Sequence, residues 1–179
     1  TLSLNRDWLY CPCDKAAFAA PRRAPRGFAR VHLPHSNVEL PLNYFSERRT
    51  QFASWYRKSI KTPSRPEGAR VFVDFDGVMM SAWVYVNGRL VRTNRGGYAG
   101  FSADITDFLR PGPGAENLLA VRVDSRLDGG VPPCGKVMDF QTFGGIYRDV
   151  RMRIVPACFI EDLFVATPKP LAARKTMSA

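Results

Sequence analysis

The chain has 179 residues, a formal net charge of +10, 45% hydrophobic residues and 12% aromatic residues. This composition suits one packed domain, with room for the start of a second, and it excludes wholesale disorder. No apolar run approaches the ~20 residues that a membrane-spanning helix needs. Residues 1–10 lack the pattern of a signal peptide, although a mature chain could have lost one. The compartment, whether cytoplasmic, periplasmic or secreted, therefore stays open.

The positive charge is concentrated in the first 70 residues, which hold 13 basic and 5 acidic side chains, against 13 and 11 in the rest. The basic positions group within residues 22–30 and 48–58. The sequence around these basic positions shows no basic helix, no zinc-ligand spacing and no RNA-binding aromatic motif. We expect a solvated face, or pairing with acidic groups of a partner. A basic nucleic-acid-binding β domain is the less favoured alternative, and tight, salt-sensitive binding to DNA or RNA would support it.

The four cysteines do not form a metal-binding pattern. Cys11 and Cys13 flank a proline, whereas Cys134 and Cys158 are distant and single. A tetrahedral zinc site generally needs two cysteine pairs with two to four residues between the members, and the two histidines do not complete such a set. We predict no metal and no cofactor for this chain. A disulfide and four free thiols both remain open.

Short segments rich in aromatic and β-branched residues, bounded by turn residues, are expected to form strands. These segments are 28–33, 52–60, 70–76, 82–86, 118–124 and 149–155. Apolar and polar residues alternate strictly in several of them, which is typical of strands packed on one side. Only residues 16–20 show weak helical character, and Pro21 ends it. The sequence therefore predicts an all-β fold, an antiparallel sandwich or barrel.

Two connections and the end of the chain have recognisable features. Asn87-Gly88 lies between two apolar runs and predicts a two-residue type I′ hairpin, because both residues tolerate a positive φ. The loop at 128–136 is long enough to line a site. Residues 159–167 are expected to form one more strand, which either opens a following domain that is cut short or lies at the edge of this one.

Motifs in a fixed order carry a resemblance to a known family. They are Leu4-Asn5-Arg6-Asp7-Trp8, Val31-His32-Leu33-Pro34-His35, Trp55-Tyr56-Arg57-Lys58, Phe75-Asp76-Gly77-Val78, Val84-Tyr85-Val86-Asn87-Gly88, Gly96-Gly97-Tyr98, Asn117-Leu118-Leu119-Ala120-Val121-Arg122-Val123 and Gly144-Gly145-Ile146-Tyr147-Arg148-Asp149-Val150. Together they resemble the N-terminal sugar-binding domain of glycoside hydrolase family 2, the family of the large β-galactosidases, β-glucuronidases and β-mannosidases. The resemblance covers roughly residues 4–156.

The resemblance implies a jelly-roll β-sandwich, like galactose-binding domains, over residues 1–158. Residues 159–179 would then be the first strand of a following immunoglobulin-like domain, or a C-terminal tail. In this family a TIM barrel with two catalytic glutamates comes next. A retaining glycosidase needs two carboxylates about 5–5.5 Å apart. The sequence has five glutamates and no Asn-Glu dipeptide, the context of the family's acid/base. We therefore expect no catalytic residue in this chain.

The resemblance also implies two sugar-binding residues, Asp139 and Asn94. Asp139 precedes the Gly-Ile-Tyr-Arg-Asp-Val motif by a few residues, and Asn94 precedes a Gly-Gly-Tyr turn. A carboxylate can accept hydrogen bonds from two adjacent sugar hydroxyls, and an amide can both donate and accept. The structural alternative is that Asp139 caps a turn and Asn94 occupies a left-handed turn position.

Other conspicuous residues have simpler explanations. We expect His35 to satisfy a backbone group in a loop, and Arg148 with Asp149 to be a structural pair that ties the last strand to a neighbouring domain. Five aromatic residues could stack on a sugar ring: Trp8, Trp55, Trp83, Tyr85 and Tyr98. Trp83 and Tyr85 share one strand face, where packing is the commoner role.

The sequence therefore favours an accessory domain of a β-galactosidase-like enzyme, which shapes the terminal-sugar subsite of a barrel outside this chain. The expected partners are the terminal sugar of a β-glycoside, the immunoglobulin-like and barrel domains, and in the parent protein a further copy of itself. An autonomous carbohydrate-binding module is the alternative, and clear sugar binding by the isolated chain would favour it. The sugar and its linkage stay open, because specificity would reside largely in the barrel.

Overall fold

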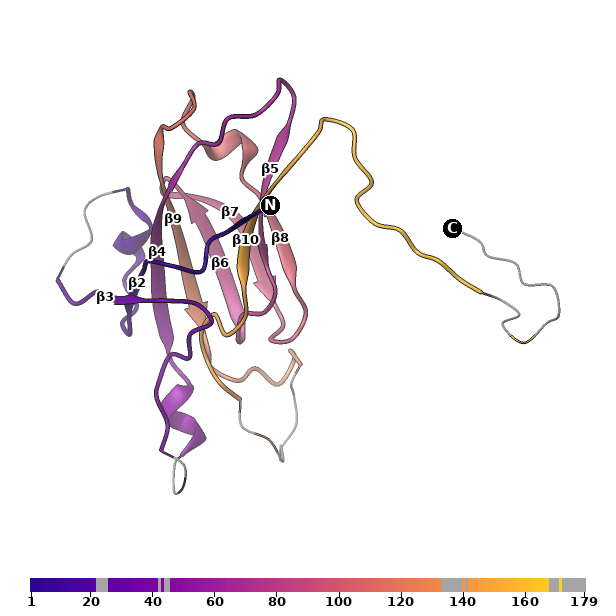
Figure 1. Cartoon of the computed structure of the whole chain (residues 1–179). Helices are drawn as coiled ribbons and strands as arrows, with labels where there is room; N and C mark the ends of the chain where they lie inside the picture. Colours follow the sequence, from indigo (N-terminus) through magenta and orange to yellow (C-terminus); the bar gives the residue numbers. More distant parts are fainter. Residues whose placement is uncertain are drawn as a thin grey trace.

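A computed structural model describes residues 1–21, 26–41, 43, 46–132, 140, 142–167 and 171. In these residues strands form two sheets packed face to face (Figure 1). The strands are β1 (Leu2–Ser3), β2 (Trp8–Cys11), β3 (Ala29–Val31), β4 (Ala53–Lys61), β5 (Arg70–Phe75), β6 (Ser81–Val86), β7 (Arg89–Arg95), β8 (Phe101–Asp104), β9 (Glu116–Asp124) and β10 (Val150–Val155). Three short 3₁₀ helices are η1 (Ala16–Ala19), η2 (Glu47–Thr50) and η3 (Thr106–Phe108).

Every strand pairing is antiparallel. The smaller sheet has the order β1-β10-β5-β8 and the larger sheet the order β3-β2-β4-β9-β6-β7. The chain changes sheet six times, between β1 and β2, β4 and β5, β5 and β6, β7 and β8, β8 and β9, and β9 and β10. This arrangement confirms the predicted all-β jelly-roll sandwich.

The core lies between the two sheets and follows the alternation seen in the sequence. On β5, Val71, Val73 and Phe75 are 0%, 0% and 1% exposed, and they pack in one cluster with Val84 and Val121 of the larger sheet. Burying a side chain of this size stabilises the fold by about 1.5–3 kcal/mol. The period of two along β5 therefore positions the smaller sheet on the larger one.

The Asn-Gly hairpin between β6 and β7 is confirmed. Asn87 and Gly88 have φ angles of 52° and 85°, both in the left-handed region that a type I′ turn needs. The Asn87 amide also donates to the Phe108 carbonyl oxygen at 2.9 Å and accepts from the Leu118 N–H at 3.1 Å. The turn is thus tied to the neighbouring connections as well as to its own strands.

The basic first part of the chain is built into the sandwich. β2 lies between β3 and β4, and η1 packs Phe18 against Trp55 on the outer face of the larger sheet. The expectation of a solvated basic face is wrong for Arg57, which is only 3% exposed and donates to the Ala20 carbonyl oxygen at 3.1 Å. Its guanidinium carbon also lies 5.7 Å from the centre of the Phe28 ring. The segment around η1 therefore covers Arg57; Arg22 and Arg23 lie outside the described residues.

The end of the described chain differs from expectation. The structure has no strand in residues 159–167, where the sequence predicts one. Phe159 packs its ring on Phe72, with 5.7 Å between the centroids, and the chain then leads away from the sandwich (Figure 1). Ile160, Phe164 and other apolar side chains of this segment are exposed. Within residues 159–167, all of which are described, the structure shows one isolated bridge residue, Ala166, and no strand.

One end of the sandwich gathers most of the long connections, and we call it the loop end. It consists of residues 33–41, 46–52, 76–80, 96–100, 125–132, 140 and 142–149, and it lies below the tip of β9 in Figure 1. The antiparallel registers bring it together, because β5, β7 and β9 end there while β4, β6, β8 and β10 begin there.

Gly145, like its neighbour Gly144, lies at a crowded point of the loop end. Its backbone forms a bridge with Met79, with N–H···O distances of 2.9 and 3.2 Å, and its φ is +101°. A Cβ atom on Gly145 would lie 2.5 Å from the Tyr56 hydroxyl oxygen and 2.8 Å from the His35 carbonyl oxygen. Only a residue without a side chain fits this position.

Behind Gly145, His35 and Tyr56 form a half-buried polar pair. The His35 Nδ1 and the Tyr56 hydroxyl oxygen are 2.9 Å apart. Which of the two atoms donates depends on the tautomer of His35. Burial lowers the pKa of His35, and the nearby Glu39 only partly opposes this effect. His35 thus satisfies a buried side chain rather than the loop backbone group that the sequence suggests.

We predict that Gly145→Ala destabilises the domain by about 2–4 kcal/mol, through the contacts with Tyr56 and His35 and the positive φ. Urea unfolding followed by circular dichroism would measure the loss. Gly129→Ala is the matched control, because a Cβ there meets nothing within 4 Å. Equal stability of the two variants would contradict the prediction.

We also predict that His35 contributes to acid unfolding. Because its pKa is lower in the folded state, the unfolded chain binds more protons as the pH falls below about 6.5, and stability falls with it. In His35→Gln, the free energy of unfolding should fall less between pH 7 and pH 5 than in the wild type. Parallel stability–pH curves for the two proteins would show that His35 is not responsible.

Candidate functional site

Asn94 is the second-to-last residue of β7 and lies next to the loop end. It pairs with Ala82 of β6, so its side chain is on the sheet face that Ala82 presents to the core. The half-buried amide donates a long hydrogen bond, 3.4 Å, to the Gly96 carbonyl oxygen. Asn94 is in a strand and has no positive φ, so the left-handed turn alternative is wrong for it. Its amide retains hydrogen-bonding capacity for a ligand at this end.

Asp139 lies outside the described residues, but the chain on both sides of it is placed. The Gly97 N–H donates to the Pro132 carbonyl oxygen at 3.3 Å, and the Tyr98 ring lies 6.3 Å from the ring of Phe140, the residue after Asp139. The turn that follows Asn94 therefore contacts both ends of the segment that contains Asp139.

Tyr147 holds the same turn from the other side. Its hydroxyl donates to the Gly97 carbonyl oxygen at 2.6 Å. The Arg148 guanidinium carbon in turn lies 5.5 Å from the centre of the Tyr147 ring. The Gly-Gly-Tyr turn and the Gly-Ile-Tyr-Arg-Asp-Val motif, quoted separately in the sequence, thus meet at one place.

The loop end exposes aromatic rings. Tyr98, Phe140 and Phe143 are 43%, 48% and 47% exposed. Of the five aromatic candidates from the sequence, only Tyr98 combines this position with an open ring. The sequence reasoning missed Phe140 and Phe143, although two phenylalanines in a Gly-rich, strand-poor stretch were a usable signal. Exposed rings of this kind can stack on a sugar or pack on another protein surface.

The other aromatic candidates serve packing. Trp8 and Trp55 are buried, and Tyr85 lies beside Trp55 with 5.6 Å between the ring centroids. The guanidinium carbon of Arg122 stands 4.6 Å from the centre of the Trp83 ring. Trp83 and Tyr85 do share the outer face of β6, as the alternation predicts.

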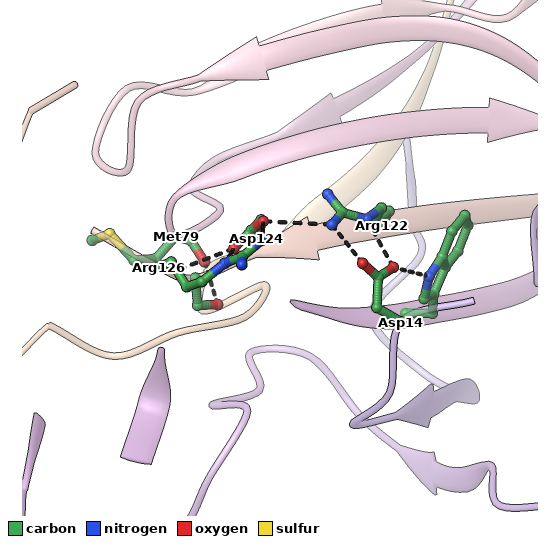
Figure 2. Close-up of polar contacts among 7 residues, drawn as sticks. Asp14, Met79, Arg122, Asp124 and Arg126 are labelled. Atoms are coloured by element: carbon green, nitrogen blue, oxygen red, sulfur yellow. Dashed lines mark hydrogen bonds and ion pairs between the residues drawn. The ribbon is translucent and has the colours of Figure 1, made fainter. Parts of the chain in front are cut away.

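A network of charges supports the end of β9 (Figure 2). The Arg122 guanidinium donates to both carboxylate oxygens of Asp14, at 2.8 and 2.6 Å, and lies 3.5 Å from Asp124, which also accepts from Arg126 at 2.8 and 2.5 Å. The bond from Arg122 lowers the pKa of Asp14, and the bond from Arg126 lowers that of Asp124. Both carboxylates therefore stay ionised at neutral pH.

From β9 the contacts continue to Met79 and Gly145. The Ser125 hydroxyl donates to the Met79 carbonyl oxygen at 2.8 Å and accepts from the Gly145 N–H at 3.2 Å. Figure 2 shows Met79 beside the Asp124–Arg126 pair. The network thus joins the segment before η1, which supplies Asp14, to the loop that follows Asp139.

A groove of ≈ 720 Å³ lies next to this network. Its lining residues are Ser81, Trp83, Arg95, Asp124, Arg126, Leu127, Asp128 and Gly129. Arg95 and Asp128 form an ion pair of 2.5 Å within it. The charges in the groove are thus mutually neutralised.

The described residues show no cluster of three His, Cys, Asp or Glu side chains that could hold a metal ion. Within the same residues, no helix has the length and apolarity to cross a membrane. Glu67 precedes β5 and Glu116 is the first residue of β9, so both lie at the end of the sandwich opposite Asn94. Neither is placed to act at the loop end.

Arg148 and Asp149 do not pair with each other in the part of the chain that the structure describes. Asp149 accepts from the Asn5 amide at 2.9 Å, and the Asn5 amide oxygen accepts from the Val150 N–H at 2.9 Å. Asp149 therefore connects the first motif of the chain to the last strand within this domain, instead of forming the Arg148 pair that the sequence suggests.

Comparisons with known proteins agree with this architecture. The sequence profile described as "Glycosyl hydrolases family 2, sugar binding domain" matches residues 7–156. A β-galactosidase of Thermoanaerobacter pseudethanolicus is 42% identical over 168 residues, which are 94% of this chain and 22% of that protein. A β-glucuronidase of Bacteroides fragilis is 32% identical, over 83% of this chain and 21% of that protein.

Among solved structures, Bacteroides uniformis β-glucuronidase 2, covalently bound to cyclophellitol-6-carboxylate aziridine, superposes with a TM-score of 0.77 and 29% identity. The match covers 93% of this chain and 20% of that one. The present chain thus spans about a fifth of the length of these relatives. On its fold, its ordered motifs and these matches, the chain belongs to glycoside hydrolase family 2, as the N-terminal sugar-binding domain.

Proposed function

We propose that the loop end of this domain forms one wall of the terminal-sugar subsite of a β-glycosidase, whose catalytic domain lies outside this chain. The observation that carries the proposal is the contact between the turn after Asn94 and the chain flanking Asp139, through Gly97 with Pro132 and Tyr98 with Phe140. Because the family resemblance assigns Asn94 and Asp139 to sugar binding, these contacts support a sugar-binding role for this end of the sandwich.

The chemistry favours a neutral terminal sugar of the galactose type. The Asp139 carboxylate would accept hydrogen bonds from sugar hydroxyls but would repel the carboxylate of a uronic acid. Of the basic groups at or beside this end, Arg95 and Arg126 are already paired with Asp128 and Asp124. The 42% identity to a β-galactosidase supports the same choice.

The domain would act by positioning rather than by chemical catalysis. Exposed Tyr98, Phe140 and Phe143 provide apolar surface for the other wall of the subsite or for the sugar ring. Because the binding groups come from one side only, the subsite is completed by the partner domain. In this proposal the domain helps to position the terminal sugar, and the catalytic domain cleaves the glycosidic bond.

We predict that Asp139→Ala in the full-length protein lowers kcat/KM for a β-galactoside at least several-fold, because the sugar hydroxyls lose an ionised acceptor. Steady-state kinetics with a chromogenic β-galactoside would measure the change, and circular dichroism would verify the fold. Asp107→Ala, an exposed aspartate in η3 at the far end, is the control that should behave as wild type. Wild-type kinetics of Asp139→Ala would remove Asp139 from the site.

Asn94→Ala should raise KM several-fold with little loss of stability, because the hydrogen bond that its amide donates to Gly96 is long. The kinetics of the full-length variant would be compared with those of Thr93→Ala, the neighbouring exposed residue on the opposite face of β7. If the two variants have the same KM, Asn94 does not contact the sugar.

A further inference from the structure

The Cys11-Pro12-Cys13 segment is an unexplained feature outside the loop contacts described above. Cys11 is the last residue of β2 and is 3% exposed, whereas Cys13 is half-buried. Their sulfur atoms lie 2.6 Å apart. Two thiols in ordinary non-bonded contact keep a wider separation, and a disulfide is only about 0.5–0.6 Å shorter than this.

The surrounding structure holds the two cysteines in place from both sides. Cys11 pairs in register with Trp55 of β4. Asp14, directly after Cys13, accepts from the Trp55 indole N–H at 3.0 Å and from Arg122 at 2.8 and 2.6 Å. The chain bends at Pro12 and Cys13, which shortens the path between these two anchors. Little chain entropy therefore remains to oppose a bond between the sulfurs.

The two sulfurs differ in access. Cys11 packs in the cluster of Phe18, Trp55 and Ala120 beneath η1, and Cys13 lies at the edge of that cluster. Burial raises the pKa of Cys11 to about 11. A reagent from solution would thus meet Cys13 first, and Cys11 would react only with a sulfur already beside it.

We propose that Cys11 and Cys13 are a disulfide-forming pair, oxidised by exchange with a low-molecular-weight disulfide such as oxidised glutathione. The Cys13 thiolate attacks the glutathione disulfide, forms a mixed disulfide and releases one glutathione thiolate. Cys11 then gives up its proton and attacks the Cys13 sulfur, which releases the second glutathione. Two protein thiols and one small disulfide thus become one protein disulfide and two glutathione thiols, and no further oxidant is needed.

Trypsin gives a direct test on the full 179-residue chain. The chain is equilibrated in a glutathione buffer rich in the oxidised form, quenched with acid, and its free thiols are then alkylated with N-ethylmaleimide in denaturant. Cleavage after Arg6 and Lys15 releases peptide 7–15, which contains Cys11 and Cys13 and no other cysteine. We expect mass spectrometry to find this peptide without maleimide and lighter by two hydrogen atoms.

Two variants sharpen the test. In Cys11→Ser, Cys13 should accumulate as the glutathione mixed disulfide, because the second attack is lost. In Cys158→Ser, which removes an exposed cysteine elsewhere, peptide 7–15 should oxidise as in the wild type. A wild-type peptide that carries two maleimides, or glutathione on Cys13, would overturn the proposal whether or not the variants fold.

Formation of the bond should also be visible in stability. Closing so short a loop restricts the unfolded chain only modestly, so we expect the oxidised protein to have a Tm about 3–6 °C higher than the reduced protein. Calorimetry with and without a phosphine reductant would compare the two forms. An equal or lower Tm for the oxidised form would show that the disulfide strains the chain at Pro12. It would contradict the proposal that the fold positions Cys11 and Cys13 to form this bond.

Discussion

The rest of the loop end depends on the close approach of Gly145 to Tyr56. The strand bridge to Met79, the hydrogen bond to Ser125 and the contact with the His35 backbone all require that Gly145 have no side chain. Together they determine where residues 142–149 run before β10 begins. Because this segment follows the chain that contains Asp139, the approach also determines where the proposed sugar-binding loop returns to the sandwich.

A second constraint joins the two ends of the domain in sequence. The Asn5 side chain donates to Asp149 and accepts from the Val150 N–H, while the Asn5 carbonyl oxygen accepts from the Leu33 N–H at 2.8 Å. One short polar residue thus satisfies backbone groups of β10 and of the segment after β3. This explains physically why motifs from the start, the middle and the end of the sequence belong to one unit: each supplies hydrogen-bonding partners that the others lack.

Local chemistry made much of the fold predictable. The Asn87-Gly88 turn depends on backbone sterics, and the alternation along β5 and β10 depends on one buried sheet face. Both features can be recognised from residues that are adjacent in the sequence. β2 was not predictable in this way, because Trp8, Tyr10 and Cys11 are all buried, between the core on one side and η1 on the other. A strand covered on both faces loses its alternation. Its position depends on segments far away in the sequence.

In the candidate site, too, some features could be predicted from the sequence and others depend on tertiary contacts. The residue types at Asn94 and Asp139 follow from the resemblance, but the contacts of Gly97 with Pro132 and of Tyr98 with Phe140 arise only from tertiary folding. Arg57 illustrates the converse: its charge predicts exposure, yet η1 and Phe28 cover it, and a backbone carbonyl compensates part of the desolvation.

Several charged side chains of the two sheets pair with each other within the domain. On the smaller sheet Arg153 pairs with Asp74 and Arg151 with Asp76, and on the larger sheet Arg122 pairs with Asp14. These pairs neutralise part of the charge on the two sheets. A few hydrogen bonds from one side contribute about 0.5–1.5 kcal/mol each, which does not offset the cost of immobilising a sugar. Tight binding therefore requires a second wall, and the rigidity of the sandwich determines how accurately the two walls meet.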